Sequence, residues 1–481
     1  MSVDSEAGRQ PSETRRSGNG AAWFAFALLF AVTAMVILRE RPYFGNMQDG
    51  QDLAYMEARG QWARFLDFDH LEFGTLSHTA FFGNSLLTRI GLEFSAEWFY
   101  LANALFVFAC FFAFWMAFKT LLVQPSGISS VVFIATTVLW PFSADLLIFP
   151  TLVEKYVIVG AAGLLYWVGT QPQVANAPNR WVLFALLNAI AFTTKLHILV
   201  FLPGLFLALV LSHRSYTRRR RLDVSITLIA WVGLTLILVH VARGGTYTRE
   251  RQGSVFSLPR LLEWRFLLLL VFSLSVTALI LLVRPRQLAF HTLVKREEFV
   301  PIAFLFAMVG SFIIWDVYQR HLAIASVMFG SALAVAVSRF PPRFGKPVAL
   351  LLLLMASFWL AVRLPYVYSS LGSFGDFIRS STALTLAEEQ AVVYSSCYEA
   401  RFNYEYYAER ESVEGIQFGW LDDPGDARLN ADSRSHGLLV LADHVLCPLE
   451  ASARFGDSRI ESVLWESGRA RGFQLIQLGG S

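Results

Sequence analysis

The stretch from 181 to 211, WVLFALLNAIAFTTKLHILVFLPGLFLALVL, decides how the chain is threaded. Read as one helix, its 31 residues would run about 46 Å at about 1.5 Å per residue, whereas the apolar core of a bilayer is about 30 Å thick. A single crossing would also place Arg180 and the arginines at 214 and 218–221 on opposite sides of the membrane. A break near 193–197 removes both difficulties and predicts two membrane helices.

The composition of the whole chain points to a membrane protein. Hydrophobic residues make up 55% of the 481 residues and charged residues only 16%, against about 25% charged residues in soluble domains. The aromatic share of 15% suits lipid contact and interfacial belts. The net charge of +3 is too small to indicate a nucleic-acid partner.

Counting the apolar runs predicts about eleven membrane helices. The runs are 21–38, 98–118, 128–148, 153–170, 181–194, 196–211, 224–242, 266–283, 299–316, 319–338 and 347–363. Arginines in the polar tail 1–20, which we expect to be disordered, place the N-terminus in the cytoplasm. Eleven crossings then place residues 364–481 outside. The predicted fold class is therefore an α-helical polytopic membrane protein, with a transmembrane domain at 21–363.

The polar C-terminal segment, 364–481, is predicted to form a small extracytoplasmic α/β domain. Short apolar runs at 391–394, 437–442 and 473–478 have the length of strands, and 380–390 has a helical pattern. Cys397 and Cys447 lie in this segment, and a disulfide between them is an open possibility in an oxidising compartment. Cys110 lies in an apolar run, where packing is the ordinary role of a cysteine.

The first outer loop, 39–97, is longer than a connector requires, and long loops are commonly functional. It opens with the sequence 46–55, NMQDGQDLAY, which we call the acidic motif. Asp49 and Asp52 would share one face of a helix with Tyr55, and the two carboxylates could bind a divalent cation or act as a general base. The alternative is that either aspartate caps the following helix. His78 is a further candidate for binding a metal or an acceptor, or a solvated interfacial residue.

Polar residues at the predicted outer ends of later helices are further candidates. Asp145 and Glu154 flank the second outer turn, where an ionisable residue is costly and is functional by default, although Glu154 could also favour a helix N-terminus. Lys195 and His197 follow the predicted break at 193–197, where a lysine could bind a phosphate or extend to the interface.

Arginines on the same predicted side would add positive charge. Arg249 and Arg251 lie in the loop 243–265, which is basic although we place it outside. Either two of the predicted spans are misassigned, or these arginines bind an anionic ligand. Arg320 begins another outer helix and suits bidentate phosphate contact, whereas His321 beside it is commonly interfacial. Acids on one side and cations on the other suit a sugar linked to a lipid phosphate.

This layout resembles the GT-C superfamily of membrane glycosyltransferases, which includes protein mannosyltransferases and lipid A aminoarabinose transferases. The resemblance rests on the acidic motif, the acid in the second outer turn, the run AFTTK at 191–195, QRHL at 319–322 and the polar C-terminal segment. Two departures are clear: the family's acidic pair is adjacent, whereas Asp49 here stands apart from Asp52, and His321 replaces a commoner tyrosine.

The resemblance implies transfer of a sugar from a polyprenyl-phosphate donor to a lipid, glycan or protein acceptor, with inversion, on the outer face of a bacterial inner membrane. Asp52, or else Asp49, would be the base or a ligand of Mg²⁺ or Mn²⁺, while Lys195 and Arg320 would hold the donor phosphate. Two alternatives remain: a glycan polymerase or ligase, and a non-enzymatic transporter or flippase of lipid-linked sugars. A polymerase or ligase should have a large later outer loop and a transporter should show repeat symmetry, neither of which the sequence has.

Overall fold

The computed structural model describes residues 12–42, 86–87, 90, 94–119, 126–140, 143–148, 153–170, 182, 267, 270–271, 274–275, 278, 325–338, 340–395, 413, 415–420, 438–443, 460–469 and 473–478. The chain divides into two compact units. The helical unit comprises residues 1–32, 61–83 and 103–360, and the sheet unit comprises residues 33–60, 84–102 and 361–481. The division falls within three long helices, which contribute residues to both units.

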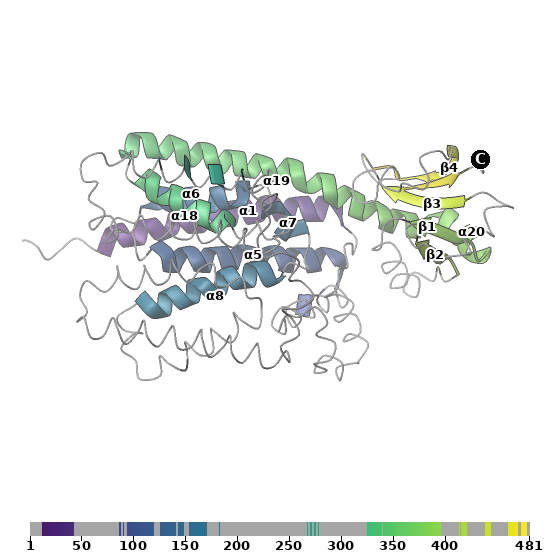
Figure 1. The fold of residues 1–481 in the computed structure, drawn as a ribbon, viewed down its shortest axis with the longest axis horizontal. Coiled ribbons are helices and arrows are strands. Elements are labelled where there is room, and N and C mark those ends of the chain that lie inside the picture. Colours follow the sequence, from purple (N-terminus) through teal and green to yellow (C-terminus); the bar gives the residue numbers. More distant parts are fainter. Residues whose placement is uncertain are drawn as a thin grey trace, which may run out of the picture. The chain divides into compact units, whose positions relative to one another are not determined.

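Three of the described helices are long and apolar enough to cross a membrane (Figure 1). They lie within α1 (Ser12–Glu40), α5 (Ala96–Phe118) and α19 (Pro342–Ile378). Each contains one of the predicted runs, 21–38, 98–118 and 347–363. At about 1.5 Å per residue, the 37 residues of α19 run about 55 Å, which exceeds the roughly 30 Å apolar core of a bilayer. A membrane-spanning α19 would therefore extend beyond the lipid tails.

One predicted membrane helix is wrong, because the structure has two helices in its place. The run 128–148 forms two helices, α6 (Gly127–Leu139) and α7 (Ser143–Ile148), rather than one. Trp140 leaves the helical conformation with φ −60° and ψ 127°, because the following residue is Pro141, whose ring disfavours helical backbone before it. At the other end, Ser126 caps α6 by accepting a hydrogen bond from the amide of Ser129 at 3.2 Å.

Close helix packing characterises the helical unit. In α8 (Val153–Thr170), Gly163 faces α5 so closely that a Cβ atom would lie 2.5 Å from the Cα of Phe114. The helices therefore approach through a small residue, as membrane helices commonly do. Trp115 of α5 donates from Nε1 to Ser130 of α6 at 3.0 Å. Helix α18 (Ala325–Ser338) packs against α6, beside which it lies in Figure 1.

The sheet unit contains a mixed five-stranded sheet in the order β2-β1-β3-β5-β4. Its strands are β1 (Val392–Ser395), β2 (Gln417–Trp420), β3 (Leu438–Asp443), β4 (Ile460–Glu466) and β5 (Phe473–Leu478). Strand β1 runs parallel to β2 and β3, whereas β5 runs antiparallel to β3 and β4. The predicted runs at 391–394, 437–442 and 473–478 correspond to β1, β3 and β5.

The interior of the sheet is apolar, and a short helix precedes it. Tyr394, Val440 and Ile476 lie in one buried cluster, in which alternate residues of the strands face the core. Helix α20 (Ser381–Glu388) matches the predicted helix at 380–390 and is capped by Ser380, whose hydroxyl accepts from the amide of Ala383 at 3.1 Å. A helix followed by a mixed sheet is the α/β arrangement expected for this part of the chain.

Candidate functional site

Two of the predicted site residues lie in described helices. Asp145 lies within α7, and Glu154 is the second residue of α8, the next helix along the chain. The other predicted site residues lie outside the described residues: Asp49, Asp52, Tyr55, His78, Lys195, His197, Arg249, Arg251, Arg320 and His321. The cysteines of the predicted disulfide, Cys397 and Cys447, also lie outside them.

A buried amide organises the ends of the helices that carry Asp145 and Glu154. Asn103 of α5 is fully buried, and its Nδ2 donates to the carbonyl oxygens of Leu146 at 2.9 Å and Leu147 at 3.4 Å. Both carbonyls belong to the last turn of α7, where a helix has no hydrogen-bond donors of its own to offer. The amide of Asn103 therefore caps the C-terminal end of α7 from a neighbouring helix.

The same amide also binds α8. The hydroxyl of Tyr156 donates to Asn103 Oδ1 at 3.0 Å, and Tyr156 is itself 1% exposed. Asn103 thus connects α5, α7 and α8 through one side chain. Tyr156 lies two residues after Glu154, and Leu146 directly follows Asp145. We call Asn103, Tyr156 and the two α7 carbonyls the amide clamp; it connects α5 to the two helices that carry the two acids.

Asn103 and Tyr156 are not among the site residues predicted from the sequence. A signal was present, because Asn103 is the only amide or charged side chain in the apolar run 98–118. Polar side chains within membrane helices face the protein interior and bond to neighbouring helices, since lipid offers them no partner. Its partners, however, lie 43 to 53 residues further along the chain, and apolar periodicity carries no information about such pairs.

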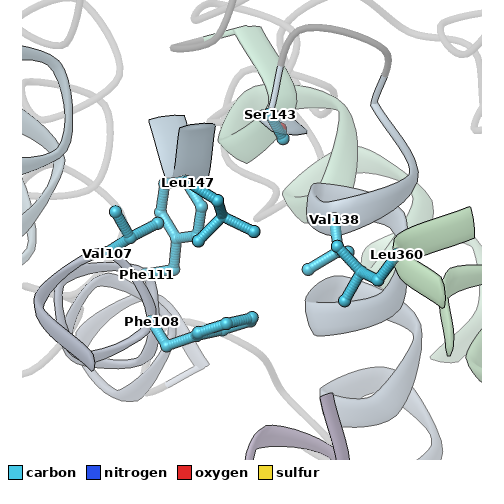
Figure 2. Close-up of a pocket in the computed structure, with 7 residues that line it drawn as sticks. All are labelled: Val107, Phe108, Phe111, Val138, Ser143, Leu147 and Leu360. Carbon is cyan, nitrogen blue, oxygen red and sulfur yellow. The ribbon is translucent and has the colours of Figure 1, made fainter. Parts of the chain in front are cut away.

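A small apolar pocket lies beside the amide clamp in the helical unit (Figure 2). Its lining residues come from α5, α6, α7 and α19: Val107, Phe108, Phe111, Val138, Ser143, Leu147 and Leu360. The cavity volume of about 10 Å³ leaves room for about one water molecule and none for a small-molecule ligand. The buried hydroxyl of Ser143 has no hydrogen-bond partner among the described residues. We assign this pocket to helix packing.

The described residues contain no group of three or more histidine, cysteine, aspartate or glutamate side chains that could hold a metal ion. The predicted ligands Asp49 and Asp52 lie outside that part of the chain, so a divalent cation at the acidic motif stays a prediction.

No family model, curated protein or solved structure matches the chain. The resemblance to the GT-C superfamily therefore rests on the motifs and the layout of the sequence. The structure contributes apolar helices of membrane-spanning length and a small α/β sheet unit.

Proposed function

We propose that this chain is a GT-C-type glycosyltransferase that moves a sugar from a polyprenyl-phosphate donor to a lipid, glycan or protein acceptor. It would act on the outer face of a bacterial inner membrane, with eleven membrane helices and a cytoplasmic N-terminus. The observation that carries the proposal is the position of the acidic motif. It begins six residues after α1, a helix of membrane-spanning length that ends at Glu40. Carboxylates at such a position would meet a donor whose phosphate is held at the membrane surface.

The proposed reaction is a direct displacement at the anomeric carbon. Asp52, or else Asp49, takes the proton of the acceptor hydroxyl, and the acceptor oxygen forms a new bond to the anomeric carbon. The bond from that carbon to the phosphate oxygen breaks, and polyprenyl phosphate leaves with the electron pair. Attack from the side opposite the leaving group inverts the anomeric centre. A divalent cation, if one is used, would be held by the same carboxylates and would polarise the reacting oxygens.

The other predicted residues would hold the substrates. Lys195 and Arg320 would bind the donor phosphate and stabilise the charge on the leaving group, with Arg249 and Arg251 adding positive potential. His197 and His321 would extend the same cationic side. Tyr55, His78, Asp145 and Glu154 would contact the sugar or the acceptor. The amide clamp supports this assignment for the last two, because it connects α7 and α8, the helices that carry them.

The proposal is tested by reconstituting the purified chain in liposomes with a panel of polyprenyl-phosphate sugars. We expect a glycosylated product and free polyprenyl phosphate in equal amounts from one donor of the panel. Movement of an intact donor across the bilayer without cleavage would instead establish the transporter alternative, and product formed only from a lipid-diphosphate donor would establish the polymerase or ligase. A phosphatase reporter fused after Ser481 should be active outside the cell membrane; a cytoplasmic reporter would contradict the eleven-helix topology.

A further inference from the structure

The side chain of Arg469 makes three hydrogen bonds within the sheet unit. It lies between β4 and β5, and its Nε donates to Asp376 Oδ2 at 2.5 Å while its Nη2 donates to Asp376 Oδ1 at 3.3 Å. Its Nη1 donates to the backbone carbonyl oxygen of Glu40 at 2.5 Å. The planar guanidinium thus binds a carboxylate with two nitrogens and still has a donor for another group.

The carbonyl that Arg469 binds lies at the end of α1, six residues before the acidic motif begins in the sequence. Glu40 is the last residue of α1, and helix-end carbonyls have no donor within the helix. The next residue, Arg41, has φ 44°, a left-handed conformation that a residue with a Cβ adopts rarely. The amide of Arg41 donates to the carbonyl of Ile37 at 2.9 Å, which closes the last turn of the helix. A strained turn of this kind persists only where its surroundings hold it.

The surroundings of Arg469 fit its guanidinium closely. Gly372 of α19 leaves the space that the guanidinium fills, and a Cβ atom at this position would collide with Arg469 Nη1. One residue further along, the hydroxyl of Ser373 accepts from the amide of Phe473 at 2.8 Å. Phe374 and Phe473 make an edge-to-face contact with ring centroids 5.5 Å apart. The β4–β5 hairpin is therefore docked on α19 by contacts other than Arg469.

We propose that Arg469 is a positioning residue, which holds the carbonyl of Glu40 and thereby fixes the conformation of the chain at 40–42, where α1 ends just before the acidic motif in the sequence. Asp376 orients the guanidinium. The contact to Glu40 adds little to hairpin docking, which the Ser373 and Phe374 contacts already supply. The consequence for catalysis rests on the proposed function, whereas the consequence for the end of α1 does not.

Hydrogen exchange of the full chain in lipid nanodiscs tests the structural part. In Arg469→Gln, we expect the peptides that cover residues 37–42 to exchange about tenfold faster, since the helix end loses a charged hydrogen-bond donor. Arg469→Lys, which keeps the charge but cannot make all three bonds, should lie between Arg469→Gln and the natural chain. Gly372→Ala displaces the guanidinium while it keeps the charges of Arg469 and Asp376. We expect its exchange at residues 37–42 to resemble that of Arg469→Gln. Agreement between two unrelated substitutions would show that the effect does not come from misfolding of one variant.

Glu466→Ala is the matched control, because it removes an exposed hydrogen bond to Gln474 in the same hairpin without touching Arg469. We expect it to leave exchange at residues 37–42 unchanged. If Arg469→Gln accelerated exchange only in the hairpin, 460–478, then Arg469 would stabilise the sheet alone and the proposal would be overturned.

Transfer kinetics test the catalytic part. We expect Arg469→Gln to lower kcat about tenfold while the KM for the polyprenyl-phosphate donor stays within about twofold, because positioning of the base is lost and donor binding is kept. An equal loss through KM, or an unchanged kcat, would overturn the positioning role. If no donor supported transfer by the natural chain, the proposed function would fail, and the exchange experiment would still decide the role of Arg469.

Discussion

Replacing Asn103 by leucine removes the amide clamp and keeps the volume of the side chain nearly unchanged. The substitution deletes hydrogen bonds of 2.9 Å to the Leu146 carbonyl and 3.0 Å to the Tyr156 hydroxyl. Each is worth about 0.6–1 kcal/mol, and leaving the buried hydroxyl and the helix-end carbonyl without partners adds about 1–3 kcal/mol. We therefore expect Asn103→Leu to lower the free energy of unfolding by about 2–4 kcal/mol.

Tyr156→Phe removes only the hydroxyl, so we expect a smaller loss of about 1 kcal/mol. Because both variants break the same hydrogen bond, the double variant should lose about 1 kcal/mol less than the sum of the two. Equilibrium unfolding in mixed micelles, followed by the fluorescence of the 13 tryptophans, measures all three.

Ser331→Ala is the control for this series. Its hydroxyl is buried but bonds at 2.7 Å to Val327, within its own helix, so its loss should cost about 0.5 kcal/mol or less. An Asn103→Leu variant within about 0.5 kcal/mol of the natural chain, or strict additivity with Tyr156→Phe, would refute the amide clamp as a stabilising connection.

Five further substitutions test the packing. Gly163→Ala should lower the free energy of unfolding by about 1–3 kcal/mol, because the added Cβ would meet backbone atoms of α5. Gly20→Ala is the control and should not destabilise the chain, because a Cβ at this position would have no atom within 4 Å. Both variants are measured by equilibrium unfolding in micelles. Trp115→Phe should cost about 1 kcal/mol through its bond to Ser130, and Ser130→Ala should add little to it in a double-variant cycle. Gly415→Ala should lower the melting temperature of the sheet unit, because Gly415 has φ 134° and its Cβ would strike a backbone carbonyl; circular dichroism in the strand region checks this.

The apolar runs predicted helices well where the run is uninterrupted and the helix depends on no particular tertiary contact. The membrane-spanning segment 20–40 of α1 and the helices α5 and α8 begin and end close to the runs 21–38, 98–118 and 153–170, because a run of this length can satisfy its backbone in lipid only as a helix. The run 128–148 failed for a local reason, since Pro141 interrupts the backbone pattern inside an apolar stretch. Apolarity continued through that position and concealed the break.

The sheet shows the limit of pattern reading. Strands β1, β3 and β5 are buried and apolar, and the sequence predicts all three. Strand β4 reads IESVLWE and was missed, because it lies at the sheet edge, leaves Ile460 and Val463 about half exposed, and pairs with β5 through two irregularities of register. Its position is determined by pairing with β5, which no local pattern encodes.

The candidate site likewise contains residues that the sequence predicted and contacts that it could not predict. Residue type and predicted topology pointed to Asp145 and Glu154, and the structure places both on helices that Asn103 connects. The clamp itself depends on tertiary contacts across more than forty residues of sequence. Likewise, Arg469 lies in a hairpin of the C-terminal segment, and its bond to Glu40 spans nearly the whole chain. Charge and periodicity could not have predicted either contact.

The central claim is that a carboxylate of the acidic motif activates the acceptor for sugar transfer. The most direct measurement is the rate of transfer by purified Asp52→Asn and Asp49→Asn in liposomes, compared with their affinity for the donor. We expect at least one of the two variants to lose transfer by about a hundredfold or more while it binds the polyprenyl-phosphate sugar as tightly as the natural chain, because general-base catalysis contributes roughly 10²–10⁴-fold. Full transfer by both variants would contradict a catalytic role for the acidic motif.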